Sequence, residues 1–278
     1  MTDYHVDRPA GFWIGHPGAL LPLPGIKGEL SRAAERPVTY KTSAGGNRRA
    51  YLSPRRAPLR EWQVTIPHLR PDEAATLHEL VTSTDPPYLW VDPFSRLTNL
   101  LPPSAVTFVG SVPTLVPLGR QPLTGGGWAT TAAANLGGGE VNLPPAPVTS
   151  GQPVTVSAYL GAPSAGRVTA VFLNSAGAEI SGTERVSAPV VGLSTLNRAS
   201  TTKVVPPGDA AAVSIRITGA TVIARPAVTW TADLMPYGAG GGSGLVVLSG
   251  LVEAIERAEL AANGKILSGI SFTVTEVG

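Results

Sequence analysis

The chain has 278 residues, which is enough for two separate hydrophobic cores. A hydrophobic fraction of 43% and a net charge of only +2 exclude an intrinsically disordered chain, because disorder needs low hydrophobicity and high net charge. The absence of cysteine excludes disulfides, thiolate metal sites and cysteine nucleophiles.

Glycine and proline are frequent, with 32 and 27 copies, and they follow no collagen-like period. This composition predicts a mostly β protein whose short strands are joined by Gly- and Pro-rich turns. No apolar run approaches about 18 residues, so we expect no membrane partner. The polar first residues, 1–8, do not have the pattern of a signal peptide, and we expect the chain to be made in a cytoplasm.

Basic residues gather early in the chain. Nine lie from Arg32 to Arg70, against the two acidic residues Glu35 and Glu61. Such a run fits either a phosphate-binding patch or a solvated, subunit-facing loop. The absence of interleaved aromatic residues favours the loop, so we expect no specific binding of nucleic acid.

One helix is predicted in residues 1–118, over residues 71–82. Pro71 and two acidic residues open it, and apolar residues recur at helical spacing from Ala74 to Val81. Small polar residues and two prolines end it before residue 88. Around this helix, alternating apolar residues predict a strand over residues 61–66, and short apolar runs predict strands at 88–91 and 106–109.

Two glycine-rich seams divide the chain. The first covers residues 119–127 and the second residues 238–244. Two seams around one segment indicate an inserted domain rather than a linear string of domains. We therefore predict a discontinuous first domain, residues 1–121 and 241–278, and an insert of residues 122–240.

The insert has the pattern of an antiparallel β-sandwich or jelly roll. Strands are predicted at residues 154–160, 168–173, 211–217 and 222–230, with turn sequences between them. The segment carries six basic and five acidic residues, so it is close to neutral. Electrostatic steering is therefore not expected to be its main means of binding.

The last segment, residues 245–278, contains one well-supported strand. Ile270, Phe272 and Val274 alternate with polar residues. The stretch 251–260 is ambiguous between strand and helix, and Asn263-Gly264 is a hairpin signal that favours strands on both sides. Because this segment has too little apolar surface to fold alone, we expect it to complete the sheet of residues 1–118.

No pattern of catalytic or metal-binding residues is recognisable. The four histidines, His5, His16, His68 and His78, have no metal-ligand spacing, and neither a nucleophile elbow nor a phosphate-binding loop is present. Paired carboxylates, as a glycosidase uses, are left open by the sequence, although the insert has few acids. We predict no enzyme activity, no catalytic residue, no metal and no cofactor.

Aromatic residues of the insert are the remaining candidates for a binding site. Sugars stack on exposed aromatic rings, and neighbouring polar groups fix their hydroxyls. Tyr159 is in phase with two hydroxyl residues, and Trp128 lies at the edge of a glycine-rich seam, so both are candidate glycan contacts. A structural role for both rings is the alternative. Phe172 and Trp230 run in phase with aliphatic residues and are predicted to be core.

Several segments together resemble the distal tail protein family of siphophages, especially minor tail proteins of actinobacteriophages. The resemblance rests on the order and spacing of residues 60–62, 71–74, 89–93, 99–103 and 271–278. The insert is similar to a carbohydrate-binding-module-type jelly roll. That similarity rests on residues 154–159, 174–177, 198–202 and 206–208.

The resemblance implies a virion protein of the tail tip, or baseplate, assembled in the host cytoplasm. Six copies would form a ring that joins the tail tube protein to the hub and tip proteins, near the tape measure protein. The insert would project outward and contact host glycan or other tail proteins. Two other hypotheses remain at this point: a glycan-binding adhesin or tail-fibre-like receptor-binding protein, and a glycan-degrading enzyme.

Overall fold

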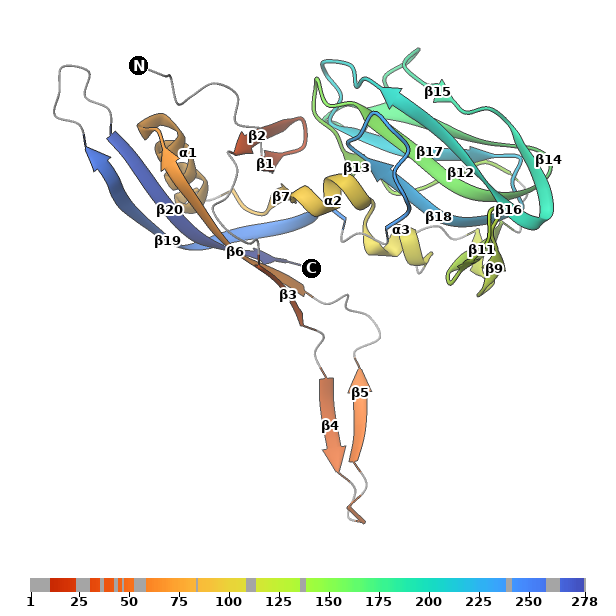
Figure 1. Ribbon diagram of the computed structural model, residues 1–278, viewed down its shortest axis with the longest axis horizontal. Coiled ribbons are helices and arrows are strands. Elements are labelled where there is room, and N and C mark those ends of the chain that lie inside the picture. The colour runs from red at the N-terminus through yellow and green to blue at the C-terminus, as the bar shows by residue number, and fades with distance from the viewer. Residues whose placement is uncertain are drawn as a thin grey trace. The chain divides into compact units, whose positions relative to one another are not determined.

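Antiparallel strands make up most of the chain, which confirms the predicted mostly β fold class (Figure 1). The computed structural model describes residues 11–23, 31–35, 38–42, 45–46, 48–52, 59–83, 85–108, 114–135, 139–238, 242–258 and 266–277. The helices within these ranges are α1 (Pro71–Thr82), α2 (Pro93–Thr98) and α3 (Pro103–Thr107). None of the helices in this part of the chain is long and apolar enough to cross a membrane.

The chain divides into two compact units. Unit 1 comprises Met1–Phe12, Pro22–Trp90 and Gly244–Gly278, and unit 2 comprises Trp13–Leu21 and Val91–Ser243. The strands β1 (Phe12–His16) and β2 (Ala19–Leu23) lie where the chain first passes between the units. The longer segment of unit 2 begins at Val91, upstream of the boundary expected at residue 122. The independent folding of residues 122–240 stays a prediction.

The main sheet of unit 1 contains the antiparallel strands β7–β19–β20–β6–β3 in that order, as part of a seven-stranded sheet. These strands are β3 (Ser31–Glu35), β6 (Leu59–Leu69), β7 (Tyr88–Val91), β19 (Gly244–Ala258) and β20 (Ile266–Glu276). The strands β4 (Val38–Thr42) and β5 (Arg48–Leu52) pair only with each other, as a two-stranded sheet. Residues 251–260 were ambiguous between strand and helix in the sequence, and they belong to strand β19 as far as Ala258. The hairpin signal Asn263-Gly264 lies outside the described residues.

Alternation along β6 and β20 places the core of unit 1 on one face of its sheet. Trp62, Val64 and Ile66 are buried, as are Phe272 and Val274 on the paired strand. Helix α1 packs against β19 and β20 (Figure 1). The last segment therefore completes the sheet of the first, as the sequence predicts.

The chain leaves and re-enters unit 1 at neighbouring points of one ladder. Trp90, the last residue before the excursion into unit 2, pairs with Gly244, the first residue after it. The C-terminal strand is fixed nearby, because the Nε of buried Arg60 donates to Glu276 Oε2 at 2.9 Å. Unit 2 is thus inserted into a turn-like position between two adjacent antiparallel strands.

An ion pair joins α1 to the sheet of unit 1. His78 Nε2 lies 2.8 Å from Glu253 Oε2 on β19. A hydrogen bond from Ser268, and to a smaller extent one from His78, lowers the pKa of the Glu253 carboxyl below its ordinary value. Both side chains of the ion pair are partly exposed, so this contact is sensitive to pH and salt.

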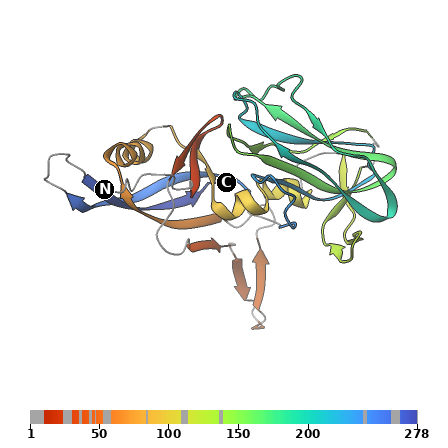
Figure 2. The same cartoon turned by 45° about the horizontal axis from the view of Figure 1, so that its top comes forward.

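Unit 2 is an antiparallel β-sandwich (Figure 2). Its strands are β8 (Leu115–Pro117), β9 (Gln121–Pro122), β10 (Trp128–Ala129), β11 (Ala132–Asn135), β12 (Val141–Asn142), β13 (Ala146–Pro147), β14 (Val154–Leu173), β15 (Arg185–Val186), β16 (Val190–Val204), β17 (Ala212–Thr218) and β18 (Val222–Thr229). One sheet has the order β16–β14–β18–β11–β8. The other joins β15 and β17 to β14, with β12 and β13 on β17.

The long strand β14 belongs to both sheets. Its first half pairs with β16 and β18, and its second half pairs with β15 and β17. The sequence predicted two separate strands here. Phe172 and Trp230 are 1% and 4% exposed, which confirms that both are core residues. The Trp230 indole donates to the carbonyl of Pro147 at 3.0 Å.

Two short helices follow β7, and one of them lies where the sequence predicted a strand. Residues 103–107 form α3, and Phe108 follows in a left-handed conformation, so the strand expected at 106–109 is wrong over the described residues. Asp92 starts α2, because its carboxylate accepts the backbone N–H groups of Phe94 and Ser95 at 2.8 Å. Both helices pack on β18, which makes them part of unit 2.

Buried Asn99, at the end of α2, fixes this packing. Its Nδ2 donates to the carbonyl of Pro226 at 2.9 Å, and its Oδ1 accepts the N–H groups of Leu101 and Val228. The side chain is fully buried. Three hydrogen bonds of one amide therefore hold the segment after α2 against β18.

Candidate ligand-binding face of the sandwich

Tyr159 lies at the centre of a row that crosses three strands. In the β ladders it stands opposite Arg198 on β16 and opposite Ala224 on β18. It shares a sheet face with Thr155 and Ser157, as the alternation predicted, but both of these residues are buried and Tyr159 itself is partly buried. Part of its ring packs on a small apolar cluster that includes Ala224.

Arg198 lies beside this ring. Its guanidinium carbon is 5.6 Å from the centre of the Tyr159 ring, and its Nη2 donates to the hydroxyl of Ser157 at 3.1 Å. Its Nε is buried and has no hydrogen-bond partner among the described residues. Burial lowers the pKa of the Arg198 guanidinium below its usual range; Tyr159 opposes this effect and the charge of Arg225 reinforces it.

Arg225 extends the row on β18. The ladder between β18 and β14 is irregular just before Tyr159, and Arg225 adopts a left-handed φ of 47° there. Its guanidinium lies 5.1 Å from the ring centre of Tyr237, and its Nη2 donates to the carbonyl of Trp128 at 2.7 Å. Burial raises the pKa of the Tyr237 hydroxyl, and the charge of Arg225 opposes that rise. Tyr159, Arg198, Arg225 and Tyr237 are called the arginine–tyrosine row below.

Trp128 is the most exposed aromatic ring near this row. Half of its surface is accessible, and Arg120 lies over it at 4.9 Å from the ring centre. The next residue, Ala129, is buried in the apolar cluster that also touches Tyr159. The structure thus brings both sequence-predicted candidates, Trp128 and Tyr159, to one region of unit 2. Whether either contacts a glycan stays a prediction.

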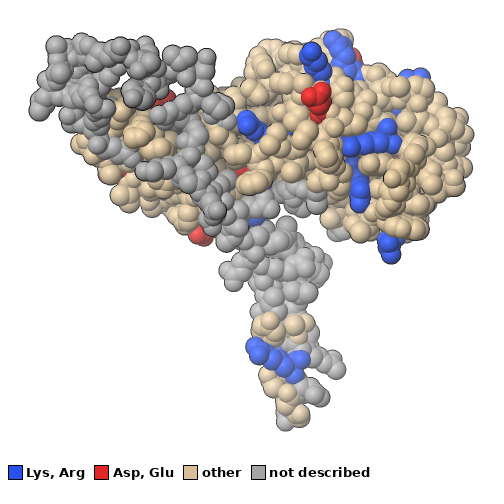
Figure 3. Space-filling view, in the orientation of Figure 1, with Lys and Arg blue, Asp and Glu red and all other residues tan. Residues whose placement is uncertain are grey.

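Charge is more concentrated here than the near-neutral composition of the segment suggests. Within the described chain, none of Arg120, Arg198 and Arg225 forms an ion pair with a carboxylate. Arg216, by contrast, pairs with Glu140 at 3.1 Å and also contacts Glu179. Figure 3 shows the visible face of the sandwich as mostly uncharged, with separate basic side chains on it. Local positive charge therefore exists without a large net charge.

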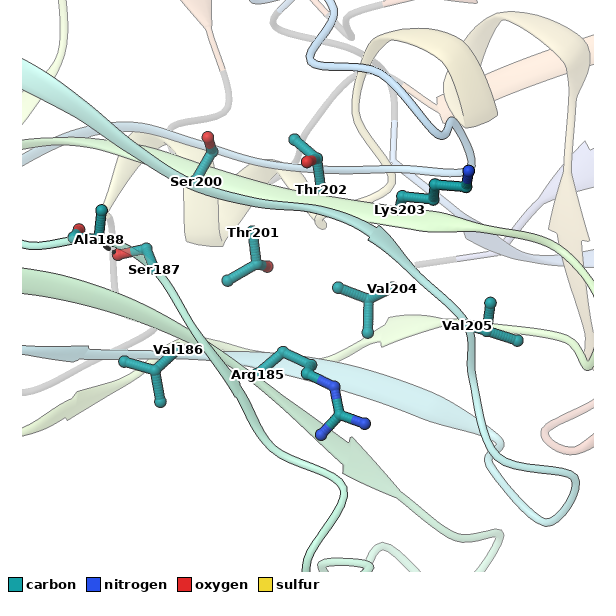
Figure 4. Close-up of a pocket in the computed structure, with 10 residues that line it drawn as sticks. All are labelled: Arg185, Val186, Ser187, Ala188, Ser200, Thr201, Thr202, Lys203, Val204 and Val205. Atoms are coloured by element: carbon teal, nitrogen blue, oxygen red, sulfur yellow. Dashed lines mark hydrogen bonds between the residues drawn. The ribbon is translucent and has the colours of Figure 1, made fainter.

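A surface hollow of about 540 Å³ lies between β15 and the end of β16 (Figure 4). Thr201 and Val204 point from β16 toward the segment that carries Arg185, while Ser200, Thr202 and Lys203 point to the other side of the strand. The Thr201 hydroxyl is buried and has no hydrogen-bond partner in the described part of the chain. The lining contains hydroxyl, aliphatic and basic groups but no aromatic ring.

The other residues considered from sequence do not come together as a site. His16, His68 and His78 lie on β1, β6 and α1, and His5 lies outside the described residues. No group of three or more potential metal ligands occurs in the described ranges. In the basic run, Arg60 and Arg70 pair with acids, and the side chains of most other members lie outside the residues that the structure describes.

Sequence reasoning missed the arginines of this face. Arg198, Arg225 and Arg120 are far apart in the chain, and each is flanked by uncharged residues. The register of β14 against β16 and the irregularity in β18 bring the first two together. The sequence offers one weak signal for this site, which is that Arg198 is followed closely by hydroxyl residues at 200–202.

No protein-family model matches the sequence, and no curated protein matches it. Solved structures give remote similarities. The enzymatically active domain of tailspike protein 4 of bacteriophage CBA120 is 11% identical over 72% of this chain and 19% of that chain, with a TM-score of 0.27. The Dit protein of phage SPP1, described as a paradigm of the hub adsorption apparatus in phages that infect Gram-positive bacteria, is 12% identical over 78% and 98%, with a TM-score of 0.22.

The VP2 subviral particle of infectious bursal disease virus is also similar, at 11% identity over 97% of this chain and 77% of that chain, with a TM-score of 0.25. The chain spans about a fifth of the tailspike domain. Two of these three neighbours are phage tail proteins. TM-scores of this size do not establish a common fold, so the function has to be argued from the residues of this chain.

Proposed function

We propose that this chain is a non-enzymatic structural component of the tail tip of a long-tailed phage. In this proposal six copies form a ring in the virion that joins the tail tube to the hub and tip proteins. Unit 1 is the ring-forming part. Unit 2 is a peripheral module that contacts host glycan or other tail proteins.

The insertion topology is the observation that carries the proposal. The sequence blocks that resemble distal tail proteins lie mainly before and after the insert, and both sides contribute strands to one sheet of unit 1. The pairing of Trp90 with Gly244 closes that sheet across the insertion. A β-rich unit interrupted by a sandwich is the architecture that the sequence resemblance implies.

The hairpin β4–β5 favours an assembled state. Its ladder has five residue pairs, and neither strand pairs with another strand of the described chain. An isolated two-stranded hairpin is only marginally stable in water. Exposed Tyr40 and the neighbouring basic side chains would gain stability by packing on another subunit. A cyclic ring uses such head-to-tail contacts.

Mass photometry of the full chain tests the ring. The expected result is a dominant species of six subunits, and negative-stain images of virions labelled on this chain should place it at the tail tip. A chain that stays monomeric at micromolar concentration and labels elsewhere would contradict the proposal.

A second candidate is a glycan-binding adhesin or tail-fibre-like receptor-binding protein. The half-exposed Trp128 and the arginine–tyrosine row favour it, because both offer ring faces next to polar groups. A monomer that binds a host glycan tightly would support this candidate. Turnover of cell-wall polysaccharide would instead support a glycan-degrading enzyme.

A further inference from the structure

In the arginine–tyrosine row, the charge of Arg225 acts on the Arg198 guanidinium and no counter-charge lies beside them in the described chain. Arg225 adds to the lowering of the pKa of Arg198, and in the described chain neither group is paired with a carboxylate. Partly buried like charges raise the free energy of the folded protein. An anion bound beside both groups would remove that cost, and a neutral ligand would not.

Arg198 also keeps unused donors. A guanidinium has five N–H donors in a planar fork. Its Nη2 donates to Ser157 and the group also interacts with the Tyr159 hydroxyl, but its buried Nε has no partner among the described residues. A planar carboxylate or a phosphate matches such a fork with two parallel hydrogen bonds.

The backbone at Arg225 is held in an uncommon conformation. A left-handed φ is rare for residues other than glycine, and such positions cluster at ligand sites. The accompanying irregularity in β18 turns the side chain toward Trp128 and Tyr237. The strained backbone at Arg225 therefore places its guanidinium beside the Tyr237 ring and within hydrogen-bond distance of the Trp128 carbonyl.

Sugar-ring recognition needs apolar platforms as well as polar groups. Tyr159 and Tyr237 are partly exposed, and Trp128 is half exposed. Tyr159 lies beside Arg198 and Tyr237 beside Arg225, whereas the Trp128 ring lies under Arg120 and only its backbone carbonyl binds Arg225. An acidic peptide would use only the charges, whereas a charged sugar polymer would use the charges and the ring faces.

We propose that the arginine–tyrosine row binds an anionic sugar polymer, one that carries carboxylate or phosphodiester groups. This proposal rests on the proposed function, because it assigns a ligand class to the peripheral module. Each site would bind weakly, and several modules on one virion would multiply the effect.

The test uses the full chain and four immobilised probes. These are polygalacturonate as a carboxylate polymer, poly(glycerol phosphate) as a phosphodiester polymer, dextran as a neutral polymer and polyglutamate as an acidic peptide. We expect binding to at least one of the two charged polymers, weaker binding as salt screens the charges, and at least about tenfold weaker binding to dextran and polyglutamate.

Two substitutions locate the site. Arg198→Gln and Arg225→Gln should each weaken binding about tenfold or more, because each removes a charge-assisted donor. Arg198→Lys keeps the charge but loses the planar fork, so its affinity should fall between those of the parent and Arg198→Gln. The matched control is Arg185→Gln on β15, which removes an exposed arginine at the hollow and should change affinity less than about twofold.

Melting curves from circular dichroism identify any variant that fails to fold, and Arg225→Lys then replaces Arg225→Gln. Equal binding to dextran or polyglutamate would overturn the proposal, as would unchanged binding by both folded row variants or a loss confined to Arg185→Gln. Mass photometry of the same samples separates the two proposals. Rings that bind neither charged polymer refute the anionic ligand alone, and monomers that bind through the row refute the tail ring alone.

Discussion

Replacing Asn99 by alanine tests whether the segment before residue 122 is part of the folded sandwich. The change removes the donor to Pro226 and the acceptor for Leu101 and Val228, and all these groups lie in a buried region. Each hydrogen bond contributes about 0.5–1.5 kcal/mol net, and more when its partner stays buried and unsatisfied. We expect the free energy of unfolding of unit 2 to fall by about 3–5 kcal/mol.

A domain of this size loses about 2–4 °C of Tm for each kcal/mol, so the expected drop is on the order of 10 °C. Differential scanning calorimetry of the full chain measures it, and the transition of unit 1 should not move. The control is Thr98→Ala, because the Thr98 hydroxyl is exposed and bonds only to the carbonyl of Phe94. A shift of less than about 2 °C for Asn99→Ala would refute the reasoning.

The packing of Asn99 against β18 also predicts how two fragments of the chain differ in stability. Residues 122–240 were predicted from sequence to fold alone, but this fragment lacks Asn99, α2 and α3. A fragment of residues 91–243 should therefore melt cooperatively and at a higher temperature than residues 122–240. Equal melting temperatures for the two fragments would show that the helices add nothing to the sandwich, and broad melts for both would contradict an independently folding insert.

Three other outcomes are expected. Trp230→Ala should destabilise unit 2 by about 3–5 kcal/mol, whereas Trp128→Ala should leave it folded; equal melting curves would contradict this contrast. Deleting residues 245–278 removes three buried side chains of β20, each worth about 1.5–3 kcal/mol, and should make unit 1 insoluble; soluble rings would show that the tail is dispensable. Because folding lowers the pKa of Glu253, its stabilising effect is present above its ordinary pKa and is lost as pH falls through the lowered value. The Tm difference between the parent and Glu253→Gln should therefore shrink between about pH 6 and about pH 3, and a constant difference would count against the His78 contact.

Much of the fold could be predicted where one residue pattern dominates. The alternation in residues 154–160 and 270–274 gave the strands, and Pro71 with its acidic neighbours gave α1. The burial of Phe172 and Trp230 could be predicted because both run in phase with aliphatic residues of their own predicted strands. These signals are local, and burial on one face of a sheet strengthens them.

The short helices were missed because their signals compete. Asp92 followed by proline was interpreted as the end of a strand, although it is equally a helix start, and its carboxylate accepts two helical N–H groups. The apolar run after Pro103 was too short to separate strand from helix. An Asp-Pro pair directly after a buried strand is therefore compatible both with a loop that ends the strand and with the start of a helix.

The candidate site could not be predicted as a set. Tyr159 is a candidate because it is in phase with hydroxyl residues, and Trp128 because it lies at the edge of a glycine-rich seam. Arg198 and Arg225, however, come near each other only through strand register and an irregular ladder. Neither feature has a sequence signature. The net charge of the insert is close to zero, and a net charge does not reveal that two arginines, Arg198 and Arg225, lie near each other.

The pairing of Trp90 with Gly244 has a consequence for how such a protein changes over evolutionary time. The two chain ends that flank residues 91–243 lie on adjacent strands, so a two-residue turn could join them if that segment were removed. The pair Trp90 and Gly244 is therefore a site at which a domain can be inserted or removed. A different module spliced at the same two residues would leave the register of β7 and β19 intact. Such an exchange would replace unit 2 while the sheet of unit 1 keeps its strand order.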